Sequence, residues 1–269
     1  KGAPTGARAT PRLVFGASVQ PGDRVLPEEV AVALSFNGTT QAVMMATPAD
    51  LEDFGVGFAL TEGIAGPQDI LSVEVETMPR GCDVQVWLRP EAESRLVARR
   101  RKMAGPVGCG LCGIDSIDQA LREVPMVASS AFRMTPAQVL AAVAALPGEQ
   151  RLHDATRAVH GAAFWNGRVF LAREDVGRHN ALDKLVGGMV RQGIGPEGAV
   201  VLTSRVSTDM VQKVAMLSAP VIVAVSAPTV AAVELAERAG ITLVALAKGD
   251  RFEVFSHTDR LKTEGAHVG

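Results

Sequence analysis

The sequence predicts an α/β fold in which helices cover both faces of one sheet, with a smaller α+β module ahead of it. In the second half of the chain, short strands made only of apolar residues alternate with amphipathic helices, as in a sheet buried on both faces. In the first half, apolar and polar residues alternate along the strands, which indicates strands with one exposed face. We therefore divide the chain into a loose arm (residues 1–23), an α+β module (24–125) and an α/β core (126–269).

The α+β module is expected to begin with a β hairpin. The dipeptide Asn37-Gly38 separates two apolar runs and accepts the positive φ angles of a tight turn. Thr47 and Pro48 are expected to open a helix, because threonine can cap a first turn and proline fits its first position. Gly63 is expected to end this helix. In order, the predicted elements are a strand over 30–36, a strand through 43–45, a helix over 48–63 and two strands within 70–88.

The α/β core is expected to begin with a helix at Thr135-Pro136, followed by a second hairpin that turns at Asn166-Gly167. Strands and helices then alternate to the end of the chain. The predicted helices cover 136–146, 179–191, 207–217 and 229–239, with a short one ahead of the core at 115–122. The predicted strands cover 159–165, 169–172, 200–203, 221–225, 241–247 and 252–255.

The bulk composition excludes several classes of protein. The chain has 269 residues, of which 47% are hydrophobic, enough to bury a core without disulfides or a structural metal. Its formal net charge of -2 gives no general attraction to nucleic acid or an anionic membrane. No run reaches the roughly 18 to 20 apolar residues of a membrane helix. Three cysteines do not make a disulfide framework. We expect a cytoplasmic protein without nucleic-acid or membrane partners.

A pair of cysteines separated by two residues is the first candidate for chemistry. Cys109 and Cys112 lie among glycines, which contribute no side chain and let a bulky partner come close. Cationic residues at 99–102 can lower the thiol pKa if the fold brings them near. Three interpretations are open: redox or sulfur chemistry on a thiolate, half of a metal site, or inert thiols in a tight turn.

Two observations weaken the metal interpretation. A structural zinc site usually needs four nitrogen or sulfur ligands, and only Cys82 remains as a third thiol. The zinc deaminase signature is also absent, because Gly108 precedes Cys109 where that signature has proline, and no glutamate lies two positions after His160. We therefore expect no resident metal.

The second candidate is a polar block at 173–184, between a predicted strand and a predicted helix. In α/β sheets this junction is where ligands bind, and arginines there can grip a phosphate. The alternative is a salt-bridged helix start, with Asp175 near the N-terminus and Lys184 further along. The next two junctions, 204–207 and 226–229, are polar as well, although each alone would be capping or turn residues. Together the three junctions predict a pocket for an anionic, phosphate-bearing ligand at one edge of the sheet.

The last candidate is the run Lys248-Gly249-Asp250-Arg251, directly after the predicted strand over 241–247. Its alternative interpretation is an ordinary polar hairpin turn. We assign no function to the Ala/Val-rich helix over 136–146, whose apolar stripe is expected to face the core.

These segments together resemble the formate dehydrogenase accessory sulfurtransferase family (FdhD type). The resemblance extends over roughly residues 26–257. The segments that carry it are Cys-Gly-Leu-Cys-Gly at 109–113, Arg-Glu-Asp-Val-Gly-Arg-His-Asn-Ala-Leu-Asp-Lys at 173–184, and Ser-Arg-Val-Ser-Thr-Asp-Met-Val-Gln-Lys at 204–213. The twelve-residue block, in its order after the cysteine loop, is the most specific of them.

The resemblance implies a cytidine-deaminase-like three-layer core with a smaller N-terminal α+β module. It implies that Cys109 carries sulfur as a persulfide and that Cys112 assists its relay or release. A cysteine desulfurase would donate the sulfur. The acceptor would be molybdenum (or tungsten) bis-molybdopterin guanine dinucleotide, bound as a client on its way to a formate dehydrogenase apoenzyme. The family also implies a homodimer.

The family's contact segment for the guanine dinucleotide matches Leu246, Ala247, Lys248, Gly249, Asp250 and Arg251. This chain departs from the family's usual pattern at Ser204, where the family often has glycine. Leu246 and Ala247 replace a more usual aromatic and a polar or thiol residue. Two other functions stay open: a chaperone that binds the cofactor without transferring sulfur, and a hydrolase related to nucleotide deaminases.

Overall fold

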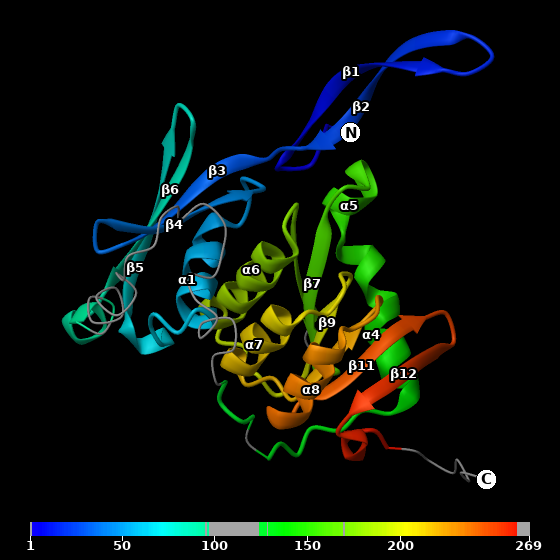
Figure 1. Cartoon of the computed structure of the whole chain (residues 1–269). Helices are drawn as coiled ribbons and strands as arrows, with labels where there is room; N and C mark the ends of the chain where they lie inside the picture. The colour runs from blue at the N-terminus through cyan, green and yellow to red at the C-terminus, as the bar shows by residue number, and fades with distance from the viewer. Residues whose placement is uncertain (1, 95, 97–123, 128, 169, 263–269) are drawn as a thin grey trace.

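The computed structural model describes residues 2–94, 96, 124–127, 129–168 and 170–262. In these residues the chain forms a six-stranded sheet, a four-stranded sheet and a two-stranded hairpin, with helices packed on the two larger sheets (Figure 1). The cysteine pair and the helix expected over 115–122 lie outside the described residues.

The second half of the chain forms the six-stranded sheet, in the order β12-β11-β10-β9-β7-β8. β9, β10 and β11 are parallel, whereas β7 and β12 run antiparallel to their neighbours and β8 runs antiparallel to β7. Each strand overlaps one that the sequence predicts. The strands are β7 (His160–Trp165), β8 (Phe170–Asp175), β9 (Ala199–Leu202), β10 (Val221–Ala224), β11 (Thr242–Lys248) and β12 (Arg251–Ser256).

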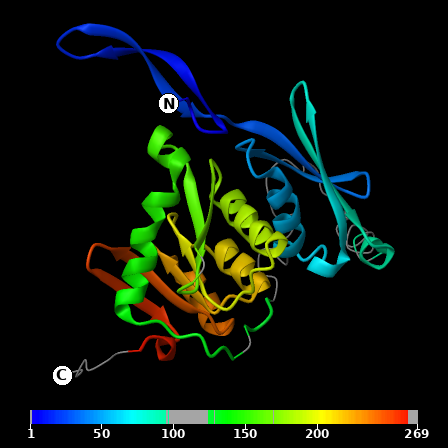
Figure 2. The ribbon, with the colours of Figure 1, turned by 180° about the vertical axis from the view of Figure 1, so that it is seen from behind.

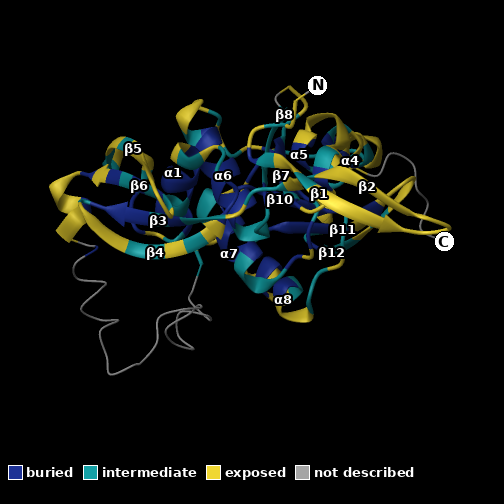
Figure 3. Cartoon of the chain, turned by 90° about the horizontal axis from the view of Figure 1, so that it is seen from above, coloured by how far each residue is buried: buried dark blue, intermediate teal, exposed yellow. Residues whose placement is uncertain are grey.

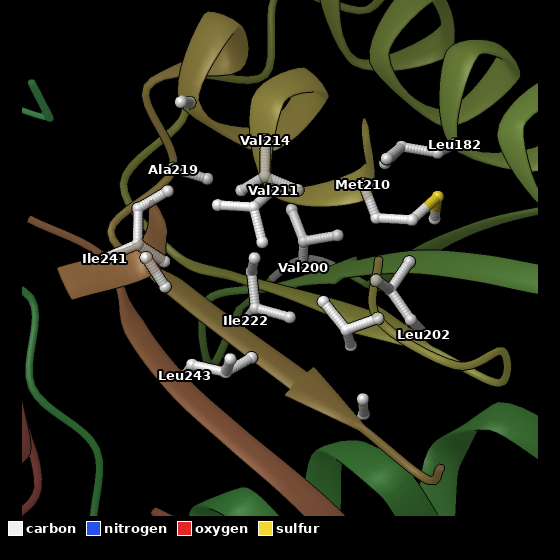
Figure 4. Packing of buried hydrophobic residues seen from close by; sticks show 14 of the residues in the cluster. Leu182, Val200, Leu202, Met210, Val211, Val214, Ala219, Ile222, Ile241 and Leu243 are labelled. Atoms are coloured by element: carbon white, nitrogen blue, oxygen red, sulfur yellow. The ribbon is translucent and has the colours of Figure 1, made fainter. Parts of the chain in front are cut away.

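Helices cover both faces of this sheet, as the sequence predicts (Figures 1 and 2). The helices on one face are α6 (Arg178–Arg191), α7 (Thr208–Leu217) and α8 (Val230–Arg238), and those on the other side are α4 (Pro136–Glu149) and the short α5 (Arg151–Thr156). Because side chains alternate along a strand, Val200 and Leu202 of β9 enter the core beneath α6, α7 and α8, and Ala199 and Val201 enter the core beneath α4. Figure 4 shows the first of these cores, where Leu182 of α6 lies over the strands.

The first half forms the four-stranded sheet, in the order β4-β3-β6-β5, with α1 packed on it. Its elements are β3 (Val30–Phe36), β4 (Thr39–Ala46), α1 (Leu51–Thr61), β5 (Ile70–Met78) and β6 (Gly81–Leu88). The predicted hairpin is confirmed, and Asn37 and Gly38 both take positive φ at its turn. The predicted helix start is wrong by three residues. α1 begins at Leu51 after Asp50, because the Thr47 side chain and backbone are bonded to residues of the second half instead.

Residues that we expected to form a loose arm form most of a β hairpin, made of β1 (Ala7–Phe15) and β2 (Val19–Pro27). The prediction rested on the glycines and prolines of this segment. It overlooked a period-two pattern that places Leu13, Phe15, Val19 and Pro21 on one face of the ladder. Figure 3 shows the hairpin largely exposed. Phe15 has a relative solvent exposure of 77%. The domain boundaries themselves stay a prediction.

The two halves meet where α1 crosses α6 at very short range. A Cβ atom added to Gly57 would lie 1.7 Å from the Asp183 carbonyl oxygen, and one added to Gly187 would lie 1.8 Å from that of Asp53. The two helix backbones are therefore close enough that only glycine fits at each crossing point. This contact fixes the four-stranded sheet relative to the six-stranded one.

We expect Gly57→Ala to lower the free energy of unfolding by at least about 3 kcal/mol, because a methyl group there overlaps a backbone atom that cannot rotate away. Gly148→Ala is the matched control, since a Cβ at this α4 position meets nothing within 4 Å. Its effect should stay within about 1 kcal/mol. Urea denaturation of both variants measures the difference, and equal midpoints would contradict the close contact.

Candidate functional site

The carboxyl ends of β9, β10 and β11 lie at one edge of the six-stranded sheet, and their junctions are hydrogen-bonded to one another. The Val206 amide donates to the Ala227 carbonyl at 3.2 Å, and the Thr229 amide donates to the Val206 carbonyl at 3.0 Å. The Leu246 amide donates to the Ser226 carbonyl at 3.2 Å. We call this the carboxyl edge. It is the position where open α/β sheets bind ligands.

The polar block at 173–184 reaches the same edge. β7 runs antiparallel to β9, so its first residue, His160, lies beyond the end of β9 and pairs with Asp175 at the end of β8. α6 then begins at Arg178. The expectation that three polar junctions share one edge is therefore confirmed, and the pocket expected there stays a prediction.

The segment 246–251 forms the end of β11 and a turn into β12. Leu246 has a φ of 53° at an irregularity in the ladder, and Ala247 is fully buried. Lys248 and Arg251 pair across the turn, and residues 248–251 are exposed. The hairpin-turn interpretation is thus correct for the backbone, while the turn also projects two cationic side chains from the carboxyl edge.

Asp175 is the centre of a buried polar network that joins the two halves. One carboxylate oxygen accepts from the Thr47 amide at 3.0 Å and from Lys184 Nζ at 2.6 Å. The other accepts from the Gly177 amide at 2.8 Å and from Asn180 Nδ2 at 3.0 Å. Asp175 and Lys184 are both fully buried. The salt-bridged helix start that the sequence offered as an alternative is therefore present.

Burial lowers the pKa of Lys184, and the Asp175 carboxylate opposes this by favouring the charged form. A second donor of the ammonium group goes to the Thr47 carbonyl, at 2.8 Å. The Phe54 ring centroid lies 5.7 Å from Lys184 Nζ. Because Lys184 is fully buried among these groups, its role is structural.

Further polar contacts hold α1 to the second half. Arg173 and Arg191 bind the Asp53 carboxylate, at 2.7 Å and 2.6 Å. On the other side of the crossing, Asp183 Oδ1 accepts from Thr61 Oγ1 of α1 at 2.6 Å and from Lys213 Nζ at 2.9 Å. Burial of Lys213 disfavours its charged form. The carboxylates of Asp183 and Glu62 favour that form, so the pKa of Lys213 is raised overall. Six residues of the polar block therefore bond across the interface between the halves: Arg173, Asp175, Val176, Asn180, Asp183 and Lys184.

Arg178 and His179 differ from these, because they lie at the first turn of α6 on the carboxyl edge. His179 Nε2 lies 3.5 Å from Asp209 Oδ2 in the first turn of α7. Arg178 Nε, His179 Nε2 and Ser207 Oγ are shielded from solvent and have no hydrogen-bond partner. The sequence analysis did not single out His160 or Asp209, since a lone histidine in a strand and an aspartate at a helix start have common structural explanations.

Cys109 and Cys112 lie outside the described residues, as do the cations at 99–102. Cys82 is described and is buried on β6. In the part of the chain that the structure describes, no three His, Cys, Asp or Glu side chains are grouped to hold a metal ion. No described helix has both the length and the apolar character needed to span a bilayer.

Loss of the buried pair is expected to destabilise the protein strongly. Lys184→Met leaves the Asp175 carboxylate buried without its cation, which typically costs about 3 to 5 kcal/mol. Arg157→Met is the control, because it removes an exposed ion pair with Asp154 and should cost about 1 kcal/mol or less. Denaturation curves distinguish the two variants, and similar losses would argue against a structural role for Lys184.

Stability should also fall in mild acid because of two histidines. The pKa values of His160 and His179 lie below their ordinary 6.5. Burial is the main cause for both, and the positive charge of Arg178 is the next. Asp175 opposes the shift at His160, and Asp209 opposes it at His179. The folded state thus binds fewer protons than the unfolded chain just below that pH, so the free energy of unfolding falls as the pH falls below about 6.5.

We expect the double variant His160→Gln/His179→Gln to depend less on pH than the wild type between about pH 7.5 and pH 5.5. Urea denaturation across this range measures the slope for each protein. Because both proteins have the same carboxylates, the difference between their slopes reports on the two histidines alone. Parallel slopes would show that these histidines do not have lowered pKa values.

Comparison with known proteins identifies the family. The model of the FdhD/NarQ family matches residues 27–262. A protein of Agrobacterium fabrum named sulfur carrier protein FdhD is 55% identical over 244 residues, 89% of this chain and 90% of that protein. One of the same name from Bordetella bronchiseptica is 48% identical over 239 residues, 87% of this chain and 86% of that protein.

A solved structure agrees with these relatives. It is the crystal structure of a Desulfotalea psychrophila protein assigned as a formate dehydrogenase accessory protein, with 25% sequence identity and a TM-score of 0.74. It covers 95% of this chain and 99% of that one, so the whole mixed α/β architecture is shared. By its sequence and its fold, the chain belongs to the FdhD/NarQ family.

Proposed function

We propose that this chain is a sulfur carrier that takes persulfide sulfur from a cysteine desulfurase onto Cys109 and passes it to a molybdenum (or tungsten) bis-molybdopterin guanine dinucleotide cofactor. The proposal extends the name of its relatives, sulfur carrier protein, to this chain. One structural observation supports it. The polar junctions of the six-stranded sheet are hydrogen-bonded to one another at the edge where α/β sheets bind ligands. The family match also spans Cys109.

The loading step balances without an added oxidant. The Cys109 thiolate attacks the outer sulfur of the desulfurase persulfide. A new sulfur–sulfur bond forms on Cys109, the old one breaks, and the desulfurase cysteine leaves as a thiolate. The reaction needs an accessible thiolate, which the surrounding glycines favour because they leave room for the partner protein.

Delivery of the sulfur as sulfide needs two electrons, and Cys112 can supply them. Its thiolate attacks the inner sulfur of the Cys109 persulfide, so that sulfide leaves and a Cys109–Cys112 disulfide forms. A cellular dithiol reductant then restores both thiols. The two-residue spacing allows this bond, which gives Cys112 a role in release.

The carboxyl edge suits a polyanionic cofactor. Lys248 and Arg251 project from the turn after β11, and Arg178 begins α6 at the same edge. Such cations bind phosphates, and Arg can do so through two parallel hydrogen bonds. The bound cofactor supplies the metal that receives sulfur, while these residues hold and orient it. Formate dehydrogenase as recipient, a homodimeric carrier and a cytidine-deaminase-like core belong to the same proposal.

Intact mass spectrometry after incubation with a cysteine desulfurase and cysteine tests the proposal. The wild type should gain the mass of one sulfur atom, and a thiol reductant should remove it. Cys109→Ala should gain nothing. Cys82→Ala is the matched control, because that thiol is buried on β6 and should not affect loading.

The activity of a formate dehydrogenase expressed with each variant distinguishes sulfur transfer from a cofactor chaperone that transfers no sulfur. A chaperone without sulfur chemistry predicts that Cys109→Ala still supports full activity of a formate dehydrogenase expressed with it. Sulfur transfer predicts that activity is lost, although the cofactor content of the dehydrogenase is kept. No mass gain in the wild type, beside an active desulfurase, would overturn the sulfur-carrier proposal.

A further inference from the structure

A cavity of about 550 Å³ lies where the C-terminal ends of α1, α6 and α7 come together, at the interface between the two halves. α6 and α7 begin at the carboxyl edge, so this cavity is at the opposite edge of the sheet. We call it the apolar cavity, because no charged or polar side chain lines it. The side chains that form most of its wall are Leu60, Ile64, Val190, Ile194, Met216 and Leu217.

Glycines keep the apolar cavity open. Gly63 and Gly193, which follow α1 and α6, both have a φ of 66°, a backbone conformation that larger residues rarely adopt. A Cβ atom added to Gly193 or Gly195 would meet nothing within 4 Å, so neighbouring side chains of the described residues do not close the hollow there. An apolar hollow of this size on a surface marks a place where another apolar group binds.

The chain leaves and re-enters the described residues at the cores that border this cavity. Leu96 belongs to the same buried core as the cavity residues Ile64 and Ala65. At the other end, Val124 packs against the core of the second half, as the cavity residues Leu60, Ile194 and Leu217 also do. The segment 97–123, which lies outside the described residues, therefore connects two points next to the apolar cavity.

The sequence of this segment contains one apolar stripe. Ile114, Ile117 and Leu121 lie at positions i, i+3 and i+7, with polar residues between them, so a helix over 114–121 would have one apolar face. Leu121 comes three residues before Val124, and even an extended chain places it within roughly 10 Å of that residue. The stripe therefore has to find its apolar partner close to the point where Val124 joins the core.

We propose that the segment 114–121 docks into the apolar cavity through Ile114, Ile117 and Leu121. Five residues of extended chain lead from Ile114 back to Cys109, so a docked segment holds Cys109 within roughly 17 Å of the cavity. The docking thus positions the cysteine pair beside the interface between the halves. It stands on the cavity and on the chain that borders it, and does not require that Cys109 carries sulfur.

Trypsin cleavage of the full chain after Arg122, followed by mass spectrometry, tests the docking. Ile117→Asp should speed this cleavage by about tenfold or more, because the segment loses the burial of one isoleucine side chain. Ser116→Asp is the matched control, since it places the same charge between the apolar positions and should change the rate by about twofold or less. In the cavity wall, Ile194→Asn should act like Ile117→Asp. Val230→Asn, at an exposed position of α8 on the carboxyl edge, should not.

Disulfide trapping locates the docked segment directly. In protein whose Cys109 and Cys112 are replaced by alanine, Ile117→Cys should form a disulfide with Leu217→Cys or with Ile194→Cys. Oxidised glutathione accepts the two electrons. The bond needs Cα atoms less than roughly 7 Å apart, so Ile117→Cys with Val230→Cys should form it at least about tenfold more slowly.

The proposal is overturned if trypsin cleaves Ile117→Asp and Ser116→Asp equally fast, or if neither cavity position is trapped faster than the Val230→Cys control. Urea denaturation checks that each variant keeps its folded core. Neither readout involves a persulfide. Failure here beside intact sulfur loading removes only the docking, and docking without loading removes only sulfur transfer.

Discussion

The crossing of α1 over α6 is the constraint on which the rest of the structure depends. Gly57 and Gly187 let the two backbones touch, and buried ion pairs on both sides of the contact fix its register. Neither type of contact suffices alone, because a buried ion pair is stable only in an exact geometry with its other hydrogen bonds satisfied. The close backbone contact supplies that geometry. It also joins the two sheets into one body, so that the N-terminal half has a direct effect on the shape of the carboxyl edge.

That effect passes through Thr47. Its amide and carbonyl bind Asp175 and Lys184, and its hydroxyl accepts from the Val176 amide. Asp175 in turn holds the Gly177 amide, which sets where α6 begins. The direction in which Arg178 leaves the helix is therefore determined by a residue more than a hundred positions earlier in the chain. A strand-to-helix junction of the large sheet is thus anchored by the smaller half.

The sequence predicted the layers of the fold better than the contacts between them. Apolar runs located the strands of the six-stranded sheet, and alternating apolar residues located β3, because these patterns survive whatever packs on top; the β1–β2 hairpin was missed. Sequence patterns did not predict the role of Thr47. Threonine is a common helix cap, but here Thr47 is hydrogen-bonded to residues of the second half. In the same way, the sequence left the polar block open between a ligand site and a salt-bridged helix start; the structure shows the salt-bridged start, and the ligand site stays a prediction. Helical geometry divides it: Asp183 and Lys184 face α1, while Arg178 and His179 lie at the open first turn. Single-residue identity cannot reveal that division, since it depends on which helix packs alongside.

The position of the thiols in the chain bears on how a carrier and its acceptor site can work together. Leu96 belongs to the core of the four-stranded sheet, and Val127 bonds to the Ala239 carbonyl after α8, at the edge opposite the carboxyl edge. Seventeen residues lie between Cys109 and Val127 in the sequence, and an extended chain spans roughly 3.3 Å per residue. Chain length therefore permits Cys109 to meet a partner at either edge. Under the proposed function, the chemistry of the acceptor's binding site selects the point of delivery, and the cations Arg178, Lys248 and Arg251 lie at the carboxyl edge. Such a carrier could load sulfur far from its client and release it at one defined place, because orientation at the release point supplies much of the rate.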